Sequence, residues 1–193
     1  AAVGALVENL RAAFKVRIGK LSWMSDETKQ AALRKLEKIN VKIGYPDKWR
    51  DYKGLVVRAD DPVGNAWRAN EWEYRYQLGK LGKPVDHDEW WMTPQTVNAV
   101  NLPLQNGLNF PAAILEPPYF APKADAALNY GAIGSVIGHE ISHSFDNTGA
   151  EFNAQGKMEN WWTPEDQMCP LGTRYSKFFI SLSPFLVVKE LVS

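Results

Sequence analysis

The segment that most restricts how this chain can fold is His139-Glu-Ile-Ser-His143, which ends a run of apolar residues. Apolar side chains spaced three and four positions apart predict a helix there with one buried face: Ile133, Val136, Ile137 and Ile141. In such a helix both imidazoles lie on one face, one turn apart, and can reach a single tetrahedral zinc ion. Glu140 projects beside them, where it can take a proton from zinc-bound water. The segment therefore predicts a hydrolytic zinc site.

Two other interpretations of this segment compete with the zinc site. The first is chance, but a sequence of this composition is expected to contain only about 0.003 matches to the pattern. The second is a structural helical module without metal, in which the protein itself satisfies both histidines by hydrogen bonds. Such a module predicts that a chelator leaves the melting temperature unchanged.

The rest of the chain is predicted to be mainly helical with a small β component. Apolar spacing predicts helices over residues 3–21, 25–40 and 63–81, and Ser25 is suited to cap the start of the second. Short apolar stretches within residues 98–115 predict one or two strands. The basic residues of the second helix are interpreted as its solvated side: Lys29, Arg34, Lys35 and Lys38.

Composition excludes several classes of function. The chain has 22 basic and 22 acidic residues, so its formal net charge is zero and nothing indicates binding to nucleic acid. No apolar run approaches the roughly 20 residues that span a bilayer, so no membrane segment is predicted. The single cysteine, Cys169, cannot form an internal disulfide.

Several stretches resemble the neprilysin and endothelin-converting-enzyme family of zinc metallopeptidases, especially its bacterial members. The main one is NYGAIGSVIGHEISHSFD at residues 129–146, followed by WWTPE at residues 161–165. FPAAILEPPYF at residues 110–120 and KIGYPDKW at residues 42–49 also resemble the family. The resemblance implies a thermolysin-like (gluzincin) catalytic-domain fragment and a zinc-dependent metalloendopeptidase that hydrolyses oligopeptides. It also implies a parent protein outside the cytoplasm.

The resemblance assigns roles to individual residues. His139 and His143 would bind one Zn²⁺ ion, and Glu140 would be the general base. Asn98 and Ala99 match an Asn-Ala pair on an edge strand that binds the backbone of the peptide substrate in this family. The next two positions are commonly aromatic in the family, whereas this chain has Val100 and Asn101.

Asp146, three residues after His143, could accept a hydrogen bond from that imidazole or could contact solvent at the end of the helix. The third zinc ligand of the family is a glutamate in a Gly-Glu-Asn-x-x-Asp type segment, and the 193 residues contain none. We therefore expect a fragment with little or no peptidase activity. Glu165 or Glu151 as a replacement ligand is one alternative, and a catalytically inactive zinc- or peptide-binding module is another.

These observations divide the chain into three parts. Residues 1–81 are predicted to form a helical region that leads into the catalytic domain. Residues 82–167 are predicted to form the catalytic core, with the edge strand and the helix of the zinc site. Residues 168–193 depart from the family pattern and are treated as a divergent C-terminal tail.

Overall fold

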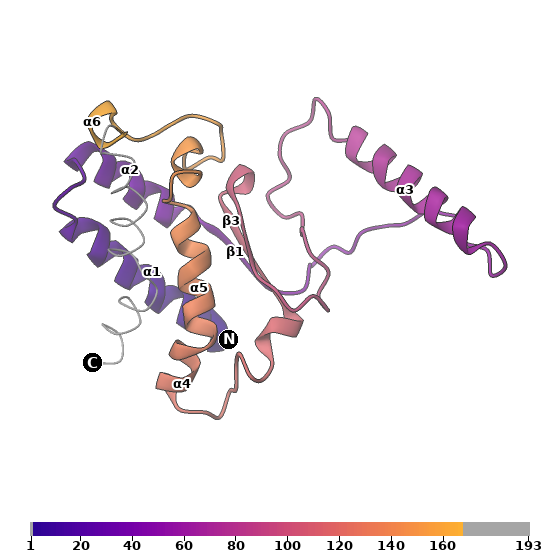
Figure 1. Ribbon diagram of the computed structural model, residues 1–193, viewed down its shortest axis with the longest axis horizontal. Coiled ribbons are helices and arrows are strands. Elements are labelled where there is room, and N and C mark those ends of the chain that lie inside the picture. Colours follow the sequence, from indigo (N-terminus) through magenta and orange to yellow (C-terminus); the bar gives the residue numbers. More distant parts are fainter. Residues whose placement is uncertain (1, 168–193) are drawn as a thin grey trace. The chain divides into compact units, whose positions relative to one another are not determined.

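The computed structural model describes residues 2–167, which form two compact units (Figure 1). One unit comprises residues 2–45 and 87–167, and the other comprises residues 46–86. Helices predominate over three short strands, so the prediction of a mainly α fold with a small β component is confirmed. The predicted C-terminal tail lies outside the described residues.

The first unit contains helices at both of its ends. They are α1 (Ala2–Lys20), α2 (Asp26–Glu37), α4 (Ala126–Gly131), α5 (Ile133–His143) and α6 (Pro164–Gln167). The positions of α1, α2 and α5 follow the helices predicted from apolar spacing. As predicted, α2 starts with a side-chain cap, because the hydroxyl of the residue before it accepts a hydrogen bond from the third residue of the helix.

A three-stranded sheet completes this unit. Its strands are β1 (Asn40–Gly44), β2 (Val100–Leu102) and β3 (Gly107–Pro111), in the order β1-β3-β2. Strand β3 pairs in parallel with β1 and antiparallel with β2. The prediction of strands within residues 98–115 is confirmed, whereas β1 was not predicted because its partner lies far along the chain.

Three short 3-10 helices connect these elements. They are η1 (Pro103–Gln105), η2 (Ala112–Leu115) and η3 (Gly149–Glu151). The last of them is the next element after α5 along the chain and begins at Gly149.

The core of this unit lies where α5 meets α1 and the sheet (Figure 1). The fully buried apolar side chains that α1, β3 and α5 contribute to it are Val7, Leu10, Phe14, Ile18, Leu108, Phe110, Ile133, Ile137 and Ile141. Each such aliphatic or aromatic side chain contributes about 1.5–3 kcal/mol when it is removed from water. Helix α5 is therefore held on its apolar side, and its opposite side carries the candidate site.

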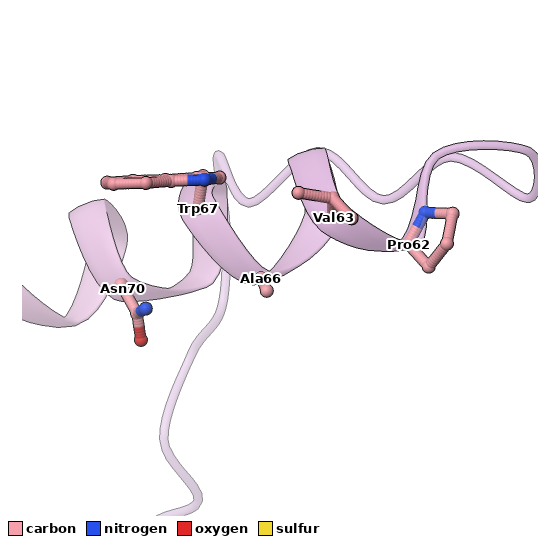
Figure 2. A pocket seen from close by; sticks show the side chains of 5 residues that line it. All are labelled: Pro62, Val63, Ala66, Trp67 and Asn70. Atoms are coloured by element: carbon pink, nitrogen blue, oxygen red, sulfur yellow. The ribbon is translucent and has the colours of Figure 1, made fainter.

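The second unit, residues 46–86, contains helix α3 (Pro62–Leu78). Asp61 caps this helix by accepting a hydrogen bond of 2.8 Å from the backbone N–H of Gly64. None of residues 46–86 is buried. Figure 2 shows a shallow pocket along one side of α3, where the side chain of Trp67 is 73% exposed.

No helix among the described residues is both long and apolar enough to cross a lipid bilayer.

The predicted helix over residues 63–81 corresponds to α3, which ends three residues earlier.

Candidate metal centre

Helix α5 brings the two imidazoles together at its C-terminal end. The Nε2 atoms of His139 and His143 are 3.0 Å apart, and their rings are nearly perpendicular, at 84°. Two ligand nitrogens on one tetrahedral zinc ion, each about 2.0–2.1 Å from the metal, lie about 3.3 Å apart. The pair therefore fits two of the four positions around a zinc ion.

Asp146 fixes the orientation of one of these rings. Its Oδ2 atom lies 2.7 Å from Nδ1 of His143, and its Oδ1 atom accepts a hydrogen bond of 2.8 Å from the backbone N–H of Gly149. A proton on Nδ1 that is donated to the carboxylate leaves the lone pair of Nε2 free for a metal. The sequence left two contacts open for Asp146, with His143 or with solvent. The structure shows the contact with His143.

The two histidines differ in their affinity for protons. The hydrogen bond to Asp146 raises the pKa of His143, and the charges of Asp146 and Glu140 add to this, although burial opposes it. Burial and the neighbouring charge of His143 lower the pKa of His139, partly offset by Asp146. A histidine that binds a metal has to be the neutral imidazole, and these shifts favour that form at His139.

Glu140 is 8% exposed and lies on the buried side of the site. Burial raises the pKa of its carboxyl, while the charge of His143 and a hydrogen bond from Asn101 lower it. A carboxylate that is partly removed from water binds a proton more readily than an exposed one, which suits a general base.

Asn101 is a candidate site residue that the sequence did not identify. Its Nδ2 atom donates to the backbone oxygen of Glu140 at 2.8 Å and to Oγ of Ser144 at 2.7 Å. These bonds join β2 to α5 directly beside the candidate general base. In the sequence Asn101 appeared only as a departure from a commonly aromatic position, because nothing local indicates its partners.

Asn98 and Ala99 lie immediately before β2, which begins at Val100, two residues later than the resemblance implied. The backbone N–H of Ala99 donates to Oδ1 of Asn98 at 2.9 Å, and Ala99 is buried whereas Asn98 is exposed. Among the described strands β2 pairs only with β3, so β2 is an edge strand of the sheet.

The described part of the chain contains no cluster of three His, Cys, Asp or Glu side chains that could hold a metal ion. Glu165 lies at the start of α6 and Glu151 at the end of η3, and both are exposed. Neither carboxylate lies in a cluster with His139 and His143 that could hold a metal ion. The structure therefore gives no support to either glutamate as a replacement for the third ligand.

Two sequence-family models match this chain, at residues 1–46 and 98–175, and together they match more than half of it. Both describe Peptidase family M13. The chain belongs to peptidase family M13. This M13 chain is 38% identical over 164 residues to an endothelin-converting enzyme homolog of Locusta migratoria, covering 81% of the chain and 23% of that relative. It is 40% identical over 166 residues to a neutral endopeptidase of Lactobacillus helveticus, covering 83% and 25%.

Solved structures of similar proteins agree with this assignment. The M13 chain matches zinc metalloprotease Zmp1 of Mycobacterium tuberculosis in complex with an inhibitor, with a TM-score of 0.81 and 51% identity, over 86% of this chain and 25% of that one. It matches PepO of Lactobacillus rhamnosis with a TM-score of 0.85 and 33% identity, and the match covers 100% of this chain and 34% of that one. The predicted thermolysin-like (gluzincin) fold class is confirmed. The chain spans about a quarter of the length of the curated relatives it matches.

Proposed function

We propose that this M13 chain carries the zinc-binding helix and the water-activating glutamate of a metalloendopeptidase that hydrolyses oligopeptides. The observation that carries the proposal is the 3.0 Å approach of the Nε2 atoms of His139 and His143, with Nδ1 of His143 hydrogen-bonded to Asp146. One curated relative is named a neutral endopeptidase, and one matched structure is titled a zinc metalloprotease, which supports the same chemistry.

The residues of this chain divide the chemistry between them. A bound zinc ion would lower the pKa of water and polarise the carbonyl of the peptide bond. His139 and His143 would hold the ion, and Asp146 would keep His143 oriented. Glu140 would take a proton from the attacking water and pass it to the leaving amine. The buried position of its carboxyl supports this role because burial increases its affinity for the proton.

The substrate would lie as an added strand along β2. Asn98 and Ala99 precede this strand, and we propose that they hydrogen-bond the backbone of an extended peptide. For the side chain of Asn98 to do so, its Oδ1 atom would have to share or exchange its hydrogen bond to the N–H of Ala99. Apolar residues after the cleaved bond are the proposed preference, as in the family.

Zinc binding is the direct test of the proposal. We expect the chain to bind one Zn²⁺ ion in competition with a chromophoric chelator, and His139→Ala and His143→Ala each to abolish binding, because each removes one of two imidazole ligands. The matched control is His87→Ala, which removes the only other histidine of the chain. If His87→Ala weakens binding as much as the other two, or if the unmutated chain binds no zinc, the proposal is wrong.

Peptidase activity of these 193 residues is a separate question. We expect little or no turnover of a quenched fluorescent peptide with added zinc, because two imidazoles and water hold zinc less tightly than three protein ligands and stabilise the transition state less. In that case the chain itself would act as a zinc- or peptide-binding module, the alternative function. Turnover that Glu140→Gln abolishes would contradict this expectation.

We also propose that the parent protein works outside the cytoplasm, which rests on the family resemblance. Fractionation of the source cells, followed by detection with an antibody against this chain, tests it. Recovery with cytoplasmic markers would refute the proposal.

A further inference from the structure

A buried lysine lies close to the candidate metal centre without touching it. Lys35 of α2 is 1% exposed, and its Nζ atom donates hydrogen bonds of 2.6 Å to the backbone oxygens of Gly149 and Phe152. The same Nζ atom lies 5.5 Å from the centroid of the Trp161 ring. A lysine is almost never fully buried unless its amine is paired, and here the partners are two backbone carbonyls of a single turn.

The turn held by Lys35 is the one that holds Asp146. Gly149 accepts from Lys35 through its carbonyl and donates through its N–H to Oδ1 of Asp146, at 2.8 Å. The other carboxylate oxygen of Asp146 bonds Nδ1 of His143, at 2.7 Å. A continuous series of hydrogen bonds therefore runs from the amine of Lys35 to the imidazole of His143.

The turn packs closely against the end of α5 at Gly149. A Cβ atom added at Gly149 would overlap the backbone of His143 and Ser144. The Cα of Gly149 is thus packed against the end of α5, and its carbonyl accepts a hydrogen bond of 3.2 Å from the backbone N–H of Phe152. Besides Lys35, the indole N–H of Trp161 donates to that carbonyl, at 3.1 Å.

We propose that Lys35 is a positioning residue for the metal centre, which fixes the turn of residues 146–152 so that Asp146 holds His143 with its Nε2 atom directed at the metal. The role of the metal rests on the proposed function, whereas the orientation of His143 does not. Loss of the Lys35 amine removes its hydrogen bond to the Phe152 carbonyl and leaves the Gly149 carbonyl with Trp161 as its side-chain donor. The turn then relaxes, and the carboxylate of Asp146 is held less firmly.

The first measurement needs no metal. In the metal-free chain, we expect a proton on Nδ1 of His143 that is bonded to Asp146 to give an imidazole resonance in the NMR spectrum that exchanges slowly with water. We expect Lys35→Met to remove this resonance, as Asp146→Asn does, while the far-ultraviolet circular dichroism is unchanged. Lys29→Met is the matched control, because the half-buried Lys29 lies on the same helix and forms an ion pair of 3.7 Å with the exposed Asp26, away from the turn. This control should keep the resonance.

The second measurement is zinc affinity by competition with a chelator. Loss of a group that orients a metal ligand typically weakens metal binding 10- to 100-fold, and we expect a loss in this range for Lys35→Met. If Lys35 acts through Asp146, the double variant Lys35→Met/Asp146→Asn should bind zinc no more weakly than Asp146→Asn alone. Additive losses, or a resonance that survives in Lys35→Met, would overturn the proposal.

Lys35→Gln is the second variant, for use if Lys35→Met does not fold. Its shorter amide keeps N–H donors and adds no charge, so it should shift zinc affinity and the His143 resonance in the same direction but less. An unchanged resonance in a folded Lys35→Gln chain would also overturn the proposal. Failure of the unmutated chain to bind zinc would refute the proposed function, and the NMR measurement would still decide the role of Lys35.

Discussion

Lys35 also makes the stability of the chain depend on pH. Burial lowers its pKa from 10.5 to about 7, and the charge of Asp146 partly offsets the burial. Between pH 7 and 10.5 the unfolded chain therefore holds a proton that the folded chain has released. Stability consequently rises with pH across this interval, by up to about 1.4 kcal/mol per pH unit, the limit for one proton.

The measurement for this prediction is the free energy of unfolding in urea at several pH values from 7 to 10. Lys35→Met removes the titrating amine, so its unfolding free energy should rise less steeply with pH than that of the unmutated chain. Both forms of the amine carry at least two N–H donors, so the hydrogen bonds to Gly149 and Phe152 persist through the titration. Equal slopes for the two chains would contradict the pKa shift.

Gly149 gives a second prediction at the residue scale. Gly149→Ala should destabilise the chain by about 1–3 kcal/mol, because the added methyl group overlaps the backbone at the end of α5. Gly19→Ala in α1 is the matched control, since a Cβ atom there meets nothing within 4 Å. Alanine at this helical position should stabilise the chain by about 0.5–1 kcal/mol. Thermal unfolding of both variants gives the comparison, and similar melting temperatures would be the contrary result.

Single residues of the candidate site were predictable to different degrees. The pair His139 and His143 was predictable because a helix repeats every 3.6 residues and the motif supplies its own spacing. Asp146 was a candidate for the same local reason. Lys35 was interpreted as solvated, which is wrong, because its acceptors lie 114 and 117 residues further along the chain. Asn101 was missed for the same reason.

At the scale of elements, the side chain of Asn101 links β2 to the C-terminal end of α5 by two hydrogen bonds. Asn101→Ala removes both hydrogen bonds of the Nδ2 atom and should cost about 1–3 kcal/mol of unfolding free energy. Asn98→Ala is the control, since the bond given for its side chain is to its own neighbour, Ala99, and it should change stability by less than about 1 kcal/mol. Urea unfolding distinguishes the two, and equal losses would show that Asn101 does not link the elements.

The elements themselves were predictable where their signals are local. Helices α1, α2 and α5 bury faces whose apolar residues recur every three or four positions, and α2 also has the cap at Ser25. Strand β1 has no such signal. It is five residues long and pairs with β3, which follows in the chain only after α3 and β2. A strand whose partner is remote is defined by the sheet that forms around it rather than by its own sequence.

At the scale of the whole molecule, the two units make very different contributions to stability. All of the buried core lies in residues 2–45 and 87–167, and none of residues 46–86 is buried. Replacement of residues 46–86 by a short Gly-Ser linker should therefore leave the first unit folded. We expect the melting temperature to change by only a few degrees and zinc affinity to remain within about threefold.

Calorimetry and chelator competition on the shortened chain test this expectation. The complementary sample is a peptide of residues 46–86, which should be largely unfolded because a 17-residue helix without a buried face is marginal in water. A shortened chain that fails to fold, or a peptide that is stably helical, would assign a structural role to the second unit.

The parallel pairing of β1 with β3 has a consequence for how the chain folds. The ends of the segment between β1 and β3 must be brought together before the two strands can pair. The entropic cost of closing this loop grows only with the logarithm of its length. Doubling the length of the intervening segment would add about 0.6 kcal/mol. Extra sequence inserted into the surface loops of residues 46–86 should thus be tolerated, which makes this segment the natural place to attach a fluorescent or affinity label.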